Sequence, residues 1–246
     1  MTFSNPTKRN AMSLEMWSGM EEILKDFSAD PAIRVVVMQG EGDKAFVSGA
    51  DISQFEKSRS DAASAAAYGA VSDSARATLN SFDKPLIAMI RGFCLGGGMG
   101  IAMAADLRFA AADSRFGIPA ANLGAAYSSD SLRRLVNLVG PSMAKDILFS
   151  ARRLDADEAL RVGLISRIAA PEALEAEVRA YAETLAQKAP LSLRASKAIV
   201  NELMKPESRQ DAAMMRDHVE ICFNSADYTE GRRAFMEKRT PVFQGR

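Results

Sequence analysis

Three consecutive glycines, Gly96–Gly98, are the first residues of this chain whose spacing suggests chemistry. They follow an apolar segment, Leu86–Ile90, that predicts a strand, and they lead into a helix predicted to begin near Gly98 and to run to about Ala105. Glycine lacks a Cβ atom, so another group can approach the backbone here. A helix N-terminus also offers unpaired N–H groups and the positive end of its dipole. This element predicts a site for an oxygen atom that carries negative charge, with a tight packing turn as the alternative.

A second stretch with accessible backbone is Lys44–Ile52, whose sequence is KAFVSGADI. It follows an apolar strand predicted at Arg34–Gln39 and a polar turn at Gly40–Lys44. The small residues of Ser48–Ala50 leave the backbone N–H groups accessible. Two N–H groups from two strand ends that converge on one carbonyl oxygen form an oxyanion hole. The two stretches together therefore predict a site that polarises a carbonyl group.

The two stretches, FVSGADI and then GFCLGGGMGIAMAAD, resemble the crotonase family, the enoyl-CoA hydratase/isomerases. The resemblance continues through RFGIPAANLG at Arg115–Gly124, through Leu135–Ile168, and through AFMEKRTPVF at Ala234–Phe243. It therefore extends over nearly the whole chain, as several separate blocks in the right order.

The resemblance implies that Ala50 and Gly97 supply the two N–H groups of an oxyanion hole. The partner would be an acyl-CoA thioester, whose carbonyl these groups polarise. No cofactor is implied apart from coenzyme A, which enters as part of the substrate.

Strands that alternate with helices predict βαβ units with right-handed crossovers. The resemblance implies a more specific α/β fold, a crotonase-like spiral of ββα units that forms two roughly perpendicular sheets. It divides the chain into a crotonase core at residues 1–190 and a C-terminal helical trimerisation region at 191–246, and it implies a homotrimer or a dimer of trimers. Thr2–Pro6 resembles only the end of the family's first long strand. The remaining pattern predicts helices at Ser13–Phe27, Ala62–Phe82, Leu154–Val162 (capped by Asp155), Pro171–Lys188, Leu191–Glu202, Glu207–Asn224 and Thr229–Lys238, and strands at Leu107–Ala112, Arg115–Gly117 and Ile165–Ile168.

Contacts with coenzyme A are also implied by the resemblance. Lys8, in the turn NPTKRNAM, matches a basic residue near the nucleotide end, although a solvated turn charge is the alternative. Phe235 and Lys238 match positions that reach the CoA site of a neighbouring subunit, and Lys238 alone would be an exposed helix charge. The other implied contacts come from the second stretch and are Ala45, Val47, Ala50, Asp51 and Ile52.

The two carboxylates of the family's hydratases are missing from this chain. Addition of water to an enoyl thioester needs one group that activates water and another that delivers a proton to the α-carbon. The family's hydratases use two glutamates, and the matching positions here are Gly100 and Ala120. Neither Gly92–Ala105 nor Arg115–Ser129 contains Asp, Glu or His. The sequence therefore argues against ordinary two-glutamate hydration.

Replacement groups are offered by the segment NLGAAYSSD at Asn122–Asp130. Its first part, Asn122–Tyr127, is similar to the methylmalonyl-CoA decarboxylase branch of the family, in which the matching tyrosine lies against the leaving carboxylate. Decarboxylation needs no general base, only an oriented carboxylate and an oxyanion hole for the enolate. Tyr127 is therefore a candidate catalytic residue, with a passive wall of the site as the alternative. Asp130 is a candidate acid or base, with a helix cap as the alternative.

Three functions follow as hypotheses. The first is decarboxylation of a malonyl-type thioester, or thioester hydrolysis, through an enolate. The second is an enoyl-CoA hydratase whose acid and base come from elsewhere, with Asp130 the nearest candidate. The third is a catalytically silent oligomer that binds acyl-CoA.

Composition limits the other possibilities. The chain has 246 residues, of which 48% are hydrophobic, so it is long enough to bury a full core. Its 31 basic and 31 acidic residues balance, which gives no electrostatic reason to expect nucleic acid or an anionic membrane as partner. Cys94 and Cys222 lie in apolar contexts, which suggests reduced thiols and a cytoplasmic protein. With His218 as its one histidine, the chain has little from which to build a metal site, and no apolar run predicts a membrane span.

Overall fold

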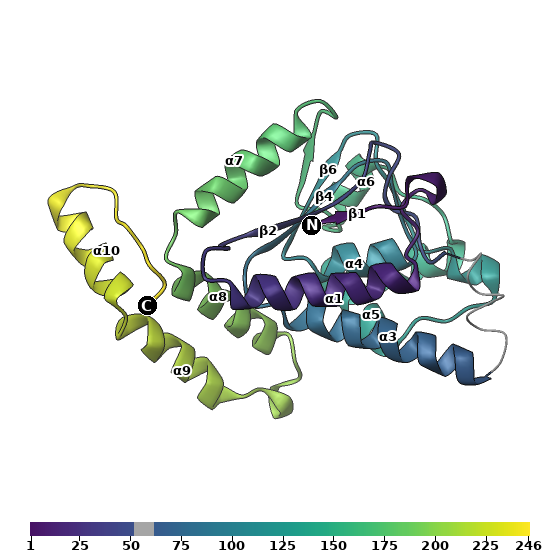
Figure 1. Ribbon diagram of the computed structural model, residues 1–246. Coiled ribbons are helices and arrows are strands. Elements are labelled where there is room, and N and C mark those ends of the chain that lie inside the picture. The colour runs from purple at the N-terminus through teal and green to yellow at the C-terminus, as the bar shows by residue number, and fades with distance from the viewer. Residues whose placement is uncertain (52–61) are drawn as a thin grey trace. The chain divides into compact units, whose positions relative to one another are not determined.

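The computed structural model describes residues 1–51 and 62–246 (Figure 1). The chain forms two compact units. Unit 1 comprises Met1–Phe27, Val37–Phe82 and Leu86–Val178, and unit 2 comprises Ser28–Val36, Asp83–Pro85 and Arg179–Arg246. Unit 2 therefore includes more of the chain than the helical region predicted at 191–246.

Two sheets position the site. The larger has the strand order β1-β2-β4-β6-β8 and the smaller the order β3-β5-β7. The pairings of β1 with β2, β4 with β6, β6 with β8, β3 with β5, and β5 with β7 are all parallel. Parallel neighbours need crossover connections, which the intervening helices supply. The strands are β1 (Thr2–Phe3), β2 (Val36–Gly40), β3 (Ala45–Val47), β4 (Leu86–Ile90), β5 (Phe93–Leu95), β6 (Leu107–Ala111), β7 (Arg115–Gly117) and β8 (Arg167–Ala169).

The strand predictions differ in how well they hold. β4 lies at the predicted Leu86–Ile90, while β2 begins and ends later than the predicted Arg34–Gln39. β8 also lies later than the predicted Ile165–Ile168, because the N–H of Ile165 still donates to the end of the preceding helix, at Ala159 O. β3 and β5 were not predicted as strands. Each has three residues, too few to show an alternating pattern, and each is defined by its partner strand.

The helices cover the predicted regions with shifted ends. In the region predicted as one helix at Glu207–Asn224, a 3₁₀ turn comes first and a helix begins only at Ala212. The carboxylate of Asp211 accepts the N–H groups of Ala213 and Met214 and so caps a new start. No helix in the described part of the chain is long and apolar enough to cross a bilayer. The helices are α1 (Leu14–Ala29), α3 (Ala62–Ser81), α4 (Gly97–Ala104), α5 (Ser129–Ser150), α6 (Ala156–Arg161), α7 (Leu174–Ala186), α8 (Pro190–Leu203), α9 (Ala212–Phe223) and α10 (Ala226–Glu237).

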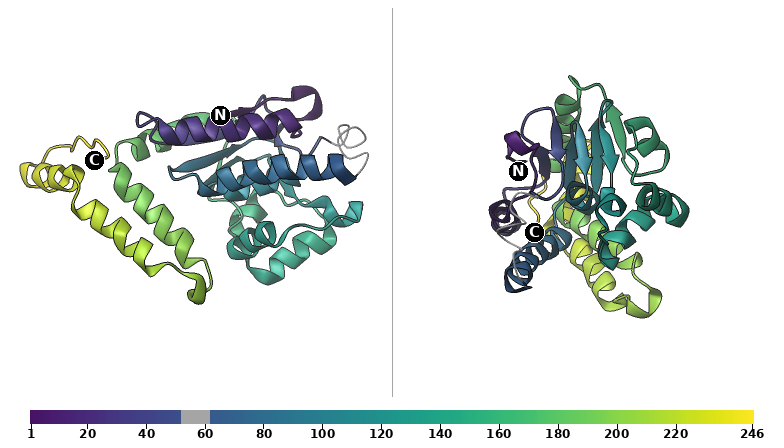
Figure 2. Two further views of the ribbon diagram at one scale, coloured as in Figure 1. Left: turned by 60° about the horizontal axis from the view of Figure 1, so that its bottom comes forward. Right: turned by 90° about the vertical axis from the view of Figure 1, so that its right-hand side faces the viewer.

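The core of unit 1 surrounds the predicted central element. All five residues of β4 are at most 5% exposed. In α4, four residues are at most 4% exposed, namely Met99 and Ile101–Met103. A short helix this apolar on every side is a core helix. Helices α1 and α3 lie side by side (Figure 2), where Ser74 donates to Glu21 at 2.9 Å and the Arg76 guanidinium stacks on Trp17. Much of the strand–turn–helix of residues 86–104 is therefore buried in the core of unit 1.

Candidate active site

Ala50 directs its backbone N–H away from the segment that supports it. Residue 50 forms a parallel bridge with Met12. The Met12 N–H donates to Gly49 O at 2.9 Å, and the Asp51 N–H donates to Met12 O at 2.9 Å. In a parallel ladder, the residue between two such bonds points its own N–H to the opposite side. The N–H of Ala50 is therefore turned away from Met12 and is available to another group.

Gly97 offers the second N–H group. It is the first residue of α4, where a backbone N–H has no partner within the helix. The preceding Gly96 adopts φ 53° and ψ −115°, a left-handed conformation that glycine permits. The N–H of Gly96 donates to Gly117 O in β7, at 2.9 Å. Gly96 is thus anchored to the sheet while the chain turns into the helix at Gly97.

Gly97 and Ala50 lie close together. A Cβ atom built on Gly97 would lie 3.8 Å from the nitrogen of Ala50 and 3.7 Å from the carbonyl carbon of Gly49. Both Ala50 and Gly97 are half-buried, so a substrate oxygen can reach them. Within the described part of the chain, neither N–H donates to a protein acceptor. Two neighbouring N–H groups without a protein acceptor are what an oxyanion hole requires.

Gly98 sets how closely α4 packs on β3. A Cβ atom at this position would overlap the carbonyl oxygen of Val47 and lie 2.9 Å from the Cβ atom of Val47. Only glycine fits such an approach of helix backbone to strand backbone. The glycine run predicted ligand access with close packing as the alternative, and at Gly98 it is close packing that requires glycine.

Asn10 is a supporting residue that the sequence analysis missed. Its side chain is 1% exposed, and its amide donates to Glu41 O at 3.0 Å and to Ala45 O at 2.8 Å. Its Oδ1 accepts the N–H of Asn5 at 3.0 Å. These bonds join the segment that carries Met12 to the start of β3. The signal available in the sequence was an asparagine in a turn, because asparagine tolerates the left-handed conformation that Asn10 adopts (φ 58°).

Asn10→Ala is expected to destabilise unit 1 by about 1–3 kcal/mol, because the buried carbonyl group of Ala45 and the partly buried carbonyl group of Glu41 lose their donor. Urea denaturation followed by circular dichroism measures this change. Asn201→Ala on α8 is the matched control, because Asn201 is exposed and its replacement is expected to be nearly neutral. Equal stability of the two variants would contradict the role assigned to Asn10.

Tyr127 places its hydroxyl beside the converging glycines. The phenol oxygen lies 3.4 Å from the position of a Cβ atom on Gly96, and the ring of Pro119 borders the same glycine at 4.0 Å. Burial raises the pKa of the Tyr127 phenol, and the positive charge of Arg76 offsets part of this shift. The phenol is therefore protonated at neutral pH and available as a hydrogen-bond donor.

The positions that match the hydratase glutamates have different surroundings. Gly100 is half-buried on α4, and no described atom lies within 4 Å of the place where its Cβ would be. It is one helical turn after Gly97, so both residues share a face of α4. Ala120 is 8% exposed in the 3₁₀ helix Pro119–Leu123, and its carbonyl oxygen accepts the N–H of Ala125. The face beside Gly97 is thus open but carries no carboxylate at position 100.

Asp130 lies in the first turn of α5, where its side chain is 83% exposed. Its carboxylate is 3.9 Å from the guanidinium of Arg133. Ser128, and not Asp130, occupies the N-cap of α5, so the prediction of Asp130 as a helix cap is wrong. The carboxylate of Asp130 is nevertheless stabilised by the helix dipole, because it lies in the first turn. The structure thus brings Tyr127 next to the predicted oxyanion hole and turns Asp130 toward solvent.

The residues implied for coenzyme A are only partly brought together. Lys8 Nζ is 2.8 Å from Asp51 Oδ2, and Asp51 is 5% exposed. The side chains of Ala45 and Val47 are at most 1% exposed, so only their backbone could contact a ligand. Ile52 falls outside the described residues.

The two C-terminal candidates lie on unit 2. Phe235, on α10, is 82% exposed, and Lys238 ends that helix in a left-handed conformation. Their contact with a neighbouring subunit, and the trimer or hexamer itself, stay predictions.

Known proteins resemble this chain along its whole length. A family model described as enoyl-CoA hydratase/isomerase matches residues 1–246. A crotonyl-CoA hydratase of Syntrophomonas wolfei is 37% identical over 240 residues, which cover 98% of this chain and 92% of that protein. A carnitinyl-CoA dehydratase of Citrobacter koseri is 33% identical over 250 residues, which cover 100% of this chain and 94% of that protein. The crystal structure of an enoyl-CoA hydratase/carnithine racemase from Magnetospirillum magneticum has a TM-score of 0.94 at 37% identity and covers 100% of this chain and 91% of its own.

Proposed function

Because the chain belongs to the enoyl-CoA hydratase/isomerase family, whose enzymes act on acyl-CoA thioesters, we propose that Ala50 and Gly97 hold the thioester oxygen of its substrate. Two N–H groups aimed at one oxygen stabilise the negative charge that develops there when the α-carbon gains electron density. The proximity of Gly97 to the nitrogen of Ala50 is the observation that carries this proposal. The intermediate is a thioester enolate, however it is formed.

Tyr127 is the polar side chain that we assign to the reacting end of the acyl group. Its hydroxyl lies against Gly96, next to the oxyanion hole, and burial keeps it protonated. A protonated phenol donates a hydrogen bond but does not remove a proton at neutral pH. Tyr127 therefore acts by orienting a substrate group and by stabilising charge, not as a general base.

Decarboxylation of a malonyl-type thioester is the reaction that this set of groups supports best. The carbon–carbon bond to the carboxylate breaks, carbon dioxide leaves, and the electron pair enters the enolate that Ala50 and Gly97 hold. A proton from water then adds to the α-carbon and completes the product. No base is needed, in keeping with Gly100 and Ala120 at the positions of the hydratase glutamates. The similarity of Asn122–Tyr127 to methylmalonyl-CoA decarboxylases stays a prediction.

Hydration is the second candidate function, because named relatives are a crotonyl-CoA hydratase and a carnitinyl-CoA dehydratase. It requires an acid and a base from outside positions 100 and 120. The candidate named from the sequence, Asp130, has a side chain that is 83% exposed to solvent, so it is poorly placed to act as the acid or base of hydration.

Tyr127→Phe is expected to lower kcat for methylmalonyl-CoA by about 10–100-fold with KM changed little, because it removes one hydrogen bond made near the developing charge. Release of carbon dioxide measures decarboxylation, and loss of enoyl absorbance of crotonyl-CoA measures hydration. Tyr228→Phe, on α10 of unit 2, is the matched control and should keep full activity.

Each outcome separates the candidates. Turnover of methylmalonyl-CoA with no hydration of crotonyl-CoA supports decarboxylation. Rapid hydration that survives Tyr127→Phe would overturn both the decarboxylase assignment and the role of the tyrosine, and it would leave the oxyanion hole intact.

A further inference from the structure

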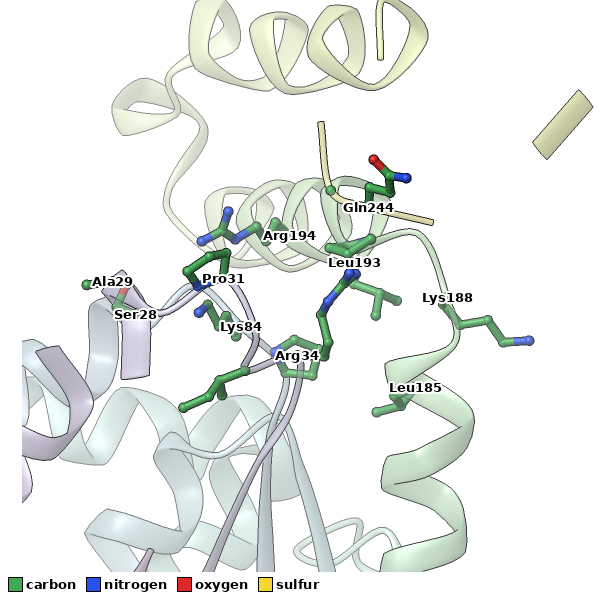
Figure 3. Close-up of a pocket in the computed structure, with 14 residues that line it drawn as sticks. Ser28, Ala29, Pro31, Arg34, Lys84, Leu185, Lys188, Leu193, Arg194 and Gln244 are labelled. Atoms are coloured by element: carbon green, nitrogen blue, oxygen red, sulfur yellow. The ribbon is translucent and has the colours of Figure 1, made fainter. Parts of the chain in front are cut away.

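A cavity of about 170 Å³ lies entirely within unit 2 (Figure 3). Its walls come from the segment Ser28–Arg34, from Lys84 and Pro85, from the end of α7 and the start of α8, and from Gln244 and Gly245. A water molecule occupies about 30 Å³ of liquid, so the cavity has room for a small molecule. It contains none of the residues assigned to the acyl-CoA site.

The charged groups of this cavity are all positive. Arg34, Lys84, Lys188 and Arg194 line it, and no acidic side chain is among the described residues of its walls. Figure 3 shows Lys188 extending away from the other three cations. Asp83 lies outside the walls and pairs with Arg194 at 2.5 Å, which offsets part of the charge. The cavity keeps an excess of positive charge.

Lys84 is the unusual member of this group because it is 5% exposed. Its Nζ donates to the carbonyl oxygen of Asp30 at 2.6 Å. Burial lowers the pKa of the Lys84 ammonium, and the charges of Arg194 and Arg34 lower it further, while the carboxylates of Asp83 and Asp30 offset part of this shift. A buried cation beside other cations is costly, and an anion among them would reduce that cost.

The backbone adds to the positive potential. Helix α8 begins at Pro190, in the wall of the cavity, with no side-chain cap at Ala189 and no acidic residue in its first turn. The positive end of its dipole is therefore not neutralised by its own sequence. Apolar residues, Ile33, Pro85 and Leu193, complete the walls and lower the local dielectric, which strengthens attraction to an anion.

We propose that this cavity of unit 2 binds a small oxyanion, a phosphate or a carboxylate group, between Arg34, Lys84 and Arg194. Arginine and lysine together with a helix N-terminus are the protein groups that recognise such anions. The inference is independent of the reaction proposed for the acyl-CoA site.

Isothermal titration calorimetry with inorganic phosphate on the full chain tests the proposal, at an ionic strength held constant with chloride. We expect saturable binding to one site. Arg34→Gln and Lys84→Met should each raise the Kd for phosphate by about tenfold or more, which is the loss of affinity expected when one charge-assisted contact is removed. Lys145→Gln, an exposed cation on α5 of unit 1, is the matched control and should bind phosphate as the parent does.

The competing outcomes are distinct. Acetate that displaces phosphate with higher affinity supports the site and assigns it to carboxylates, while weaker displacement assigns it to phosphates. Binding that never saturates, or that is equal in Arg34→Gln and the parent, would overturn the proposal. Arg34→Gln decides the matter if Lys84→Met fails to fold, because Arg34 is only half-buried.

Discussion

Gly97→Pro is expected to lower kcat by about 10²–10³-fold, the loss measured when one donor of an oxyanion hole is removed. Proline has no N–H group, and residue 97 is the first residue of α4, a position that accepts proline well. A Cβ atom there would meet its nearest neighbour at 3.7 Å, an ordinary contact. The variant should therefore fold and bind substrate while it loses one of the two N–H groups of the proposed oxyanion hole.

Gly97→Ala is the matched control, because it adds a Cβ atom but keeps the N–H group. It should keep most of the parent's turnover of the acyl-CoA thioester that the parent uses. Steady-state kinetics on both variants, with circular dichroism to confirm folding, provides the comparison. Equal losses in the two variants would show that bulk at residue 97, and not its hydrogen bond, limits the reaction.

Gly98→Ala is expected to destabilise the protein by about 3 kcal/mol or more, the upper range for forced overpacking, or to prevent folding. The added methyl group would overlap the carbonyl oxygen of Val47, a backbone atom that cannot move without distorting β3. Because β3 leads directly into the loop of Ala50, the distortion would also displace the first N–H of the site.

The same substitution two residues later should have the opposite effect. No described atom lies within 4 Å of a Cβ atom on Gly100, and alanine in a helix interior is favoured over glycine by about 0.5–1 kcal/mol. Thermal unfolding of Gly98→Ala and Gly100→Ala should therefore shift the Tm in opposite directions. A stable Gly98→Ala protein would contradict the close approach of α4 to β3.

The sequence was most informative where one element carries several signals. β4 has a continuous apolar run and α4 has a glycine run followed by small residues, and both elements lie within a residue of their predicted bounds. Membership of the enoyl-CoA hydratase/isomerase family, together with the solved neighbours, confirms the crotonase-like α/β fold with its C-terminal helices. β3 and β5, with three residues each, could not be read in this way, because a short strand is specified by its neighbours.

Site residues were harder to predict because their roles depend on the direction in which their side chains point. Tyr127 and Asp130 are three residues apart and were both candidates, yet the first is partly buried beside Gly96 and the second points to solvent. The turn into α5 decides this, and no local pattern reports it. Asn10 escaped notice for a similar reason, since its partners, Glu41 O and Ala45 O, are backbone atoms without a signature in the sequence.

The oxyanion hole proposed here is made of two main-chain amides, which affects how mutation can change the site. A backbone N–H belongs to every amino acid except proline, so nearly all missense changes at residues 50 and 97 leave the donor in place. A catalytic carboxylate is different, because one base change can turn a glutamate codon into a glycine or alanine codon. A lineage built on such a scaffold can therefore lose or exchange its acid and base while it keeps the capacity to activate a thioester.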